Sequence, residues 1–181
     1  MKKEEVRRQA KARKSLLSDA ERAEAARRVF GFVEQTAAFM LAEHILMYNS
    51  LADELCTREF IDRWADRKRF YLPRVNGVNL EILPYDRNRL HLGAFHIEEP
   101  DGDDVVDSHS IELVIVPAVA YDRRGNRVGR GKGFYDRLLA DTDAVTMGVA
   151  YECQLFDEIE VDDFDIPVHY VITESGIIKI S

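Results

Sequence analysis

The sequence predicts an α/β fold, with a mostly parallel sheet between helices that cover both of its faces. Short apolar segments with the character of strands alternate with segments whose apolar residues recur at the helical period. The segment at residues 113–117 is apolar throughout, which is typical of a central parallel strand buried on both faces. Alternating strands and helices pack as a sheet between two helical layers, so we expect a three-layer α/β/α arrangement.

The helices are predicted from apolar periodicity and from capping residues. A polar, mostly exposed helix is expected at residues 2–15. Ser18 begins the next helix and has Glu21 three residues later, the spacing of a capping box. Thr57 is expected to cap a further helix. A last helix is expected to begin near Tyr135.

The predicted strands account for most of the remaining apolar residues. They fall at residues 44–48, 70–73, 80–83, 113–117, 145–150, 168–173 and 177–180. The connection from residue 86 to residue 110 is predicted as one long loop. A loop of that length within a domain is usually functional or mobile.

Composition limits the classes of protein to consider. The chain has 181 residues, of which 46% are hydrophobic and 32% charged, as expected for one globular domain over residues 1–181. There is no apolar run long enough to span a bilayer, and we expect no membrane association. Two cysteines, Cys56 and Cys153, fit a reducing cytoplasm. The net charge of −8 argues against nonspecific binding of nucleic acid over the whole surface.

The segment at residues 126–136 is the strongest functional signal. Its three glycines alternate with cations, and a helix is predicted to follow directly. Glycine lets backbone N–H groups close around a ligand, and a helix N-terminus attracts anions. The spacing matches neither a P-loop nor a dinucleotide fingerprint, so we expect a phosphate site of another kind. A flexible, solvated basic loop is the alternative interpretation.

Several other polar residues are candidates for binding a ligand, and each also has an ordinary structural or surface role as an alternative. Lys3 and Arg7 lie one helical turn apart and share a face, although they could serve solubility alone. Asn49 and Glu54 follow a predicted strand, where ligands bind in α/β sheets, although either could simply hold the turn. Hard divalent cations prefer carboxylate oxygens. Asp136, beside the glycine segment, and Asp165, just before the strand predicted at residues 168–173, could supply them, or they could be surface or capping groups.

Taken in order, these segments resemble the 5-formyltetrahydrofolate cyclo-ligase (methenyltetrahydrofolate synthetase) family over nearly the whole chain. The most specific match is the pair of motifs at residues 117–122 and 125–136, which ends in Phe134-Tyr135-Asp136. Weaker matches in the same order are residues 3–7, 54–57, 97–100, 154–155 and 171–173. Cys56 stands where relatives carry an acid, and Phe134 where tyrosine is common.

The resemblance implies a fold and an activity. The fold would be Rossmann-like, of the kind shared with sugar-phosphate isomerases and CoA transferases. The reaction would be the ATP- and Mg²⁺-dependent cyclisation of 5-formyltetrahydrofolate to 5,10-methenyltetrahydrofolate, with release of ADP and phosphate. The formyl oxygen would be phosphorylated and N10 would then attack the activated carbon. The protein would be a cytoplasmic monomer or weak homodimer that binds small molecules, with no nucleic-acid or membrane partner.

The resemblance also implies roles for individual residues. Arg130 and Lys132 would be catalytic. ATP would contact Lys3, Arg7, Arg127, Val128, Gly129, Arg130, Gly131, Lys132, Gly133, Phe134 and Tyr135. The folate would contact Asn49, Glu54, Phe95, Arg130, Gly131, Lys132, Gly133 and Phe134. Asp136 and Asp165 would hold Mg²⁺.

Two other classes of function remain open from the residues alone. An anion- or nucleic-acid-binding module would use the basic loop as its patch, and its binding would weaken steeply with salt and need no Mg²⁺. A sugar-phosphate isomerase or CoA transferase would share the sheet but would need no ATP.

Overall fold

The computed structural model describes residues 1–93 and 97–181. Its centre is a seven-stranded sheet in the order β12-β11-β9-β6-β1-β2-β3. The strands are β1 (His44–Leu46), β2 (Arg69–Asn76), β3 (Asn79–Pro84), β6 (Leu113–Val116), β9 (Val145–Val149), β11 (Tyr170–Thr173) and β12 (Gly176–Lys179). The five inner strands run parallel, whereas β3 and β12 pair antiparallel at the two edges. The predicted, mostly parallel sheet is confirmed.

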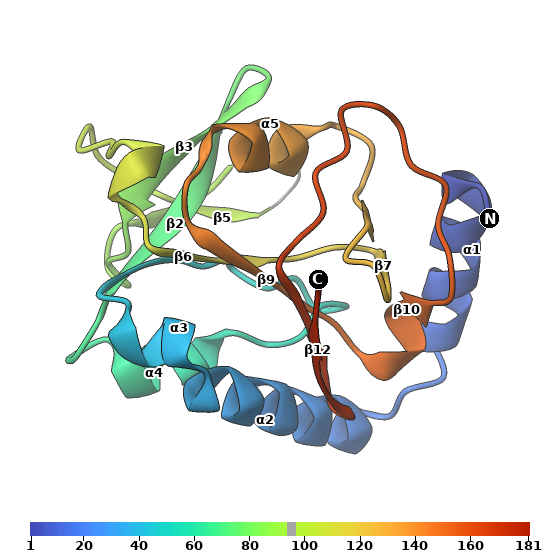
Figure 1. The fold of residues 1–181 in the computed structure, drawn as a ribbon. Helices are drawn as coiled ribbons and strands as arrows, with labels where there is room; N and C mark the ends of the chain where they lie inside the picture. The colour runs from blue at the N-terminus through green and yellow to red at the C-terminus, as the bar shows by residue number, and fades with distance from the viewer. Residues whose placement is uncertain (94–96) are drawn as a thin grey trace.

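Helices cover both faces of this sheet, as predicted (Figure 1). On one face lie α2 (Asp19–Gln35), α3 (Ala37–Leu41) and α4 (Arg58–Trp64), and on the other lies α5 (Phe134–Asp141). Successive strand residues alternate between the two layers: Ile45 and Met47 pack on the α2 side, and Leu46 packs with α5. Among the described residues, no helix is long and apolar enough to cross a membrane.

Strand β6 occupies the middle of the sheet, with three strands on each side. All four of its residues are buried, and successive ones contribute to opposite core layers. A strand that is apolar at every position fits only where both faces are covered by helices. The central position predicted from its composition is therefore confirmed.

One predicted cap is confirmed and another is wrong. Ser18 accepts a hydrogen bond from the Glu21 N–H at 3.1 Å and its own N–H donates to Glu21 Oε1 at 3.0 Å, completing the capping box. Thr57 precedes α4 but makes no side-chain cap. Its buried hydroxyl instead donates to the Tyr48 carbonyl at 2.9 Å, so Thr57 ties the end of the β1 segment to the start of α4.

Two small sheets lie outside the predicted elements. The expected loop at residues 86–110 contains the hairpin of β4 (Leu90–Leu92) and β5 (Glu98–Pro100) and the short helix η2 (Ser108–Ser110). A three-stranded sheet combines β7 (Ala120–Asp122), β8 (Arg127–Val128) and β10 (Leu155–Phe156), with η3 (Glu152–Gln154) leading into β10. These strands have two or three residues each, too few to show a periodic pattern in the sequence.

Helix α1 (Lys3–Lys14) packs against the three-stranded sheet, at one end of the molecule (Figure 1). Val6 and Ala10, one turn apart, are fully buried in a small core with Val128 and Phe156. Polar residues cover the rest of the helix, so the expectation of a mostly exposed helix holds apart from this narrow stripe. The stripe fixes which way the helix faces, and so directs Lys3 and Arg7 toward the neighbouring glycine segment.

Candidate active site

A cavity of about 540 Å³ opens where the chain leaves the carboxyl ends of β1 and β6. Its walls come from α1, the turn at residues 48–54, the segment at residues 117–119, the glycine segment at residues 127–136 and the segment at residues 162–165. Pro73, Val75 and Leu80 add an apolar surface from β2 and β3. In parallel α/β sheets this edge is the usual place for a ligand.

The glycine segment takes a conformation that few other residues adopt. Gly131 has φ +99° and Gly133 has φ +71°, both in the left-handed region that favours glycine. Gly133 is the N-cap of α5, and the first residues of that helix, Phe134 to Asp136, line the cavity. The N-terminus of an eight-residue helix therefore faces the cavity beside exposed Lys132, which favours an anion there.

Arg127 is a buried cation in the wall of this cavity, and its side chain is only 7% exposed. Its guanidinium donates to the Pro117 carbonyl at 3.2 Å and lies 3.4 Å from Asp136 Oδ1. Within residues 1–93 and 97–181, the buried Nε atom has no hydrogen-bond partner. A buried donor without a partner is costly unless a ligand satisfies it, so this position fits a bound anion.

Helix α1 brings two more cations to the same cavity. Arg7 Nε donates to the Gly129 carbonyl at 2.9 Å. Lys3 Nζ lies 2.5 Å from Asp165 Oδ2 and 2.8 Å from Asp162 Oδ2. Burial acts to lower the pKa of Lys3, but hydrogen bonds and charge from the two aspartates outweigh it and raise the pKa above its ordinary value. Lys3 therefore remains charged at neutral pH.

The opposite side of the cavity holds a partly buried carboxylate, Glu54. Glu54 Oε1 accepts a hydrogen bond from the Leu51 N–H at 2.9 Å, and Oε2 lies 4.0 Å from the Arg130 guanidinium. Burial raises the pKa of Glu54 above its ordinary value, and it outweighs the opposing Leu51 hydrogen bond and the nearby Arg130 charge. Asn49, at the mouth of this region, donates to Glu98 Oε2 at 3.2 Å. The arrangement offers an acceptor to a ligand that carries N–H donors.

Nearly all of the predicted site residues therefore gather around one cavity. Val128 is the exception, because its side chain is buried in the small core beneath the loop. Phe95 lies outside the described residues. Sequence reasoning missed Asp162, Phe164 and Glu99, which also line the cavity. The acidic run around Asp165 was a signal for Asp162. Glu99 falls in the weakly matching segment at residues 97–100, although that match predicted no place for it in the cavity.

Two carboxylates could contribute to a metal site. Asp136 and Asp165 both line the cavity, but no group of three or more His, Cys, Asp or Glu side chains within residues 1–93 and 97–181 is arranged to hold a metal. Each of the two also faces a cation, Arg127 or Lys3. This set fits a metal that takes most of its oxygens from phosphate and water, as Mg²⁺ does when it binds with a nucleotide.

Comparison with known proteins places the chain in a family. Residues 1–174 match the 5-formyltetrahydrofolate cyclo-ligase family. The chain belongs to this family. It is 34% identical over 148 residues to the 5-formyltetrahydrofolate cyclo-ligase of Escherichia coli K12, covering 76% of this chain and 81% of that protein. It is 28% identical over 152 residues to the mouse protein of the same name, covering 75% of each chain.

Solved structures agree with this assignment. The structure of Aquifex aeolicus 5,10-methenyltetrahydrofolate synthetase superimposes with a TM-score of 0.89 and 30% identity, over 98% of this chain and 92% of that one. The Mycoplasma pneumoniae 5,10-methenyltetrahydrofolate synthetase superimposes with a TM-score of 0.77 at 20% identity, over 96% of this chain and 99% of that one, and supports the fold alone. The family and the fold expected from the sequence are confirmed.

Proposed function

We propose that this chain catalyses the ATP-dependent cyclisation of 5-formyltetrahydrofolate to 5,10-methenyltetrahydrofolate, with release of ADP and phosphate. The observation that supports it best is that one cavity joins a cationic glycine segment to a partly buried carboxylate, Glu54. The first suits a triphosphate and the second suits the N–H groups of a pterin ring. Family membership supports the same reaction.

The reaction divides into two displacements. The formyl oxygen of the folate attacks the γ-phosphorus of ATP, and ADP leaves. N10 then attacks the formyl carbon and gives up its proton, and phosphate leaves with the formyl oxygen and takes that proton while the five-membered ring closes. The nucleophile in each step belongs to the substrate, so the protein's task is to align the reactants and neutralise charge on the phosphates.

The cationic residues carry the first part of that task. Lys132 and Arg130 would contact the transferred phosphoryl group, and Arg127 and the N-terminus of α5 would stabilise the remaining phosphate oxygens. Arg7, held against the Gly129 carbonyl, would contact the nucleotide from α1, together with Lys3. Asn49 and Glu54 would hold the folate, with Glu54 accepting from the pterin.

Mg²⁺ would be held by Asp136 and Asp165, and when bound it would neutralise charge on the phosphates. Asp136 and Asp165 would then release Arg127 and Lys3, with which they pair in this structure, and the two cations would contact phosphate instead. We also propose that residues 1–181 act as one domain, since α1 is paired with residues 162 and 165 near the other end of the chain.

The test is a direct assay. Purified protein is mixed with 5-formyltetrahydrofolate, MgCl₂ and ATP, and the methenyl product is followed by its near-UV absorbance while ADP is measured in parallel. We expect equal amounts of product and ADP, and neither when a non-hydrolysable ATP analogue replaces ATP. Folded protein that yields no ATP-dependent product contradicts the proposal. Salt-sensitive binding of oligonucleotides without turnover would favour an anion-binding module instead.

A further inference from the structure

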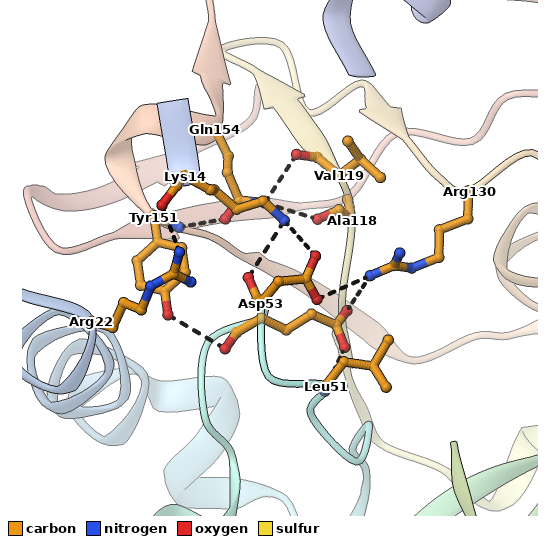
Figure 2. Close-up of polar contacts among 10 residues, drawn as sticks. Lys14, Arg22, Leu51, Asp53, Ala118, Val119, Arg130, Tyr151 and Gln154 are labelled. Atoms are coloured by element: carbon orange, nitrogen blue, oxygen red, sulfur yellow. Dashed lines mark hydrogen bonds and ion pairs between the residues drawn. The ribbon is translucent and has the colours of Figure 1, made fainter. Parts of the chain in front are cut away.

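Asp53, next to Glu54, joins two cations that come from different parts of the fold (Figure 2). Its Oδ2 atom lies 3.0 Å from Lys14 Nζ, and its Oδ1 atom lies 3.5 Å from the Arg130 guanidinium. Lys14 is the last residue of α1, and Arg130 belongs to the glycine segment. One carboxylate thus connects the helix, the turn and the loop that together wall the cavity.

Lys14 is an unusual anchor because its side chain is only 7% exposed. Buried lysines are rare unless they are paired, and here Nζ contacts both the carboxylate and, at 3.4 Å, the carbonyl of Asp53. Arg22 fixes the C-terminal end of α1 by donating a hydrogen bond to the Lys14 carbonyl at 2.5 Å. Burial acts to raise the pKa of Asp53, but the Lys14 hydrogen bond and the charges of Lys14 and Arg130 lower it below its ordinary value.

Arg130 lies near two carboxylates, and either of them could form its main ion pair. Its guanidinium is 3.5 Å from Asp53 and 4.0 Å from Glu54. Asp53 is half exposed, whereas the Glu54 side chain is 14% exposed, and among the residues that the structure describes its one other donor is the Leu51 N–H. If Asp53 were absent, the nearest carboxylate for Arg130 would be Glu54. The present 4.0 Å ion pair between Arg130 and Glu54 would then shorten, and it would occupy the acceptor that the folate needs.

We infer that Asp53, anchored by buried Lys14, is a positioning residue that draws the Arg130 guanidinium toward itself, keeps its ion pair with Glu54 at 4.0 Å, and so leaves the Glu54 carboxylate able to accept from the folate. This inference rests on the proposed function, because it assigns Asp53 an effect on folate binding. Holding the guanidinium in place before the substrates bind also removes a reorganisation that binding would otherwise require.

The test is a double-mutant cycle with Asp53→Asn, Arg130→Met and the double variant, comparing KM for 5-formyltetrahydrofolate, KM for ATP and Tm. We expect Asp53→Asn to raise the folate KM about fivefold, the size expected when an exposed charge pair is lost, with little change in the ATP KM. In the Arg130→Met background the same substitution should leave the folate KM unchanged, since no guanidinium remains to turn onto Glu54.

Matched variants separate positioning from stability. Lys14→Met should raise the folate KM in the same way, and Lys14→Arg should restore it. Asp62→Asn removes the carboxylate of another exposed Arg–Asp pair, with Arg87, and should change neither KM. A wild-type protein without turnover would overturn the proposed function and this inference together. An active wild type overturns the inference alone if Asp53→Asn leaves the folate KM unchanged or raises it equally in both backgrounds.

Discussion

The two sides of the cavity are built in opposite ways. The cationic side consists of Arg127, Arg130 and Lys132, with Lys3 and Arg7 from α1, and most of it comes from a single continuous segment. The strand side consists of Tyr48, Glu54, Pro73, Val75 and Leu80, which come from separate parts of the chain. The cationic side presents charge on a backbone shaped by glycine, whereas the strand side is mainly apolar, with a partly buried carboxylate at Glu54 and a buried one at Glu99.

This difference indicates how the two substrates are recognised. A triphosphate carries the same charge whatever its orientation, so cations and N–H groups on a loop can follow it. A flat, apolar ring with a few N–H donors needs a fixed surface and one acceptor in a set place. The strand side supplies that surface because its residues sit on or beside the central sheet.

The largest expected effect comes from removing a cation of the loop. Lys132→Ala should lower kcat about 100-fold, because the transferred phosphoryl group would lose a charged donor. Tm should hardly change, since the Lys132 side chain is exposed. The matched comparison is Arg127→Ala, which should lower both kcat and Tm because Arg127 is buried and holds the Pro117 carbonyl. Steady-state kinetics and thermal melts distinguish the two variants; full kcat in Lys132→Ala would contradict its assigned role.

An intermediate effect is expected at the proposed metal ligand. Asp136→Asn should raise the Mg²⁺ concentration needed for half-maximal rate about tenfold, because a neutral amide is a weaker ligand than a carboxylate. Asp141→Asn, at the other end of the same helix, is the control and should leave the Mg²⁺ titration unchanged. Superimposable titrations of Asp136→Asn and the wild type would remove Asp136 from the metal site.

The smallest effect is expected on the strand side. Glu54→Gln should raise the folate KM about fivefold and leave the ATP KM nearly unchanged, because the amide still accepts a hydrogen bond but carries no charge. The pKa of Glu54 is raised by burial, so its ionised form costs folding free energy above that pKa. The variant should therefore melt higher than the wild type at about pH 7, and the difference should shrink as the pH falls toward about 3, where the acid is protonated in both the folded and the unfolded state.

The kinetics and the melts of Glu54→Gln also test whether the two sides of the cavity bind different substrates. If Glu54→Gln altered the ATP KM as much as the folate KM, the division of the cavity into two substrate sides would be wrong. A Tm that was lower than wild type at every pH would show that the Leu51–Glu54 contact outweighs the desolvation of the carboxylate.

Features formed by neighbouring residues were predicted from the sequence, whereas contacts between residues far apart in the chain were not. Periodicity found the long strands and α2, and the glycine pattern found the loop and the start of α5. The ion pairs of Lys3 with Asp162 and Asp165 join residues about 160 positions apart, and no local pattern announces them. For the same reason, the burial of Arg127 and of Lys14 became visible only with the fold, since both read as ordinary charged residues.

The misassigned role of Thr57 has a related cause. A threonine before a helix is a common cap, and the sequence offered no competing acceptor. In the fold, the Tyr48 carbonyl at the end of the β1 segment lies within reach of its hydroxyl, and a buried carbonyl without a donor is costly. The tertiary contact therefore outweighed the local capping preference.

The attachment of α1 has a consequence for biosynthesis. The helix is made before its partners, because Lys3 pairs with Asp162 and Asp165 and Val6 packs beside Phe156. While the ribosome is still extending the chain, the central strands can pair in turn, but the core under α1 is complete only after Phe156 has emerged, and the Lys3 ion pairs only after Asp165 has emerged. The nucleotide side of the cavity is therefore among the last parts to form, and a nascent chain that stops short of residue 156 should expose α1 to protease.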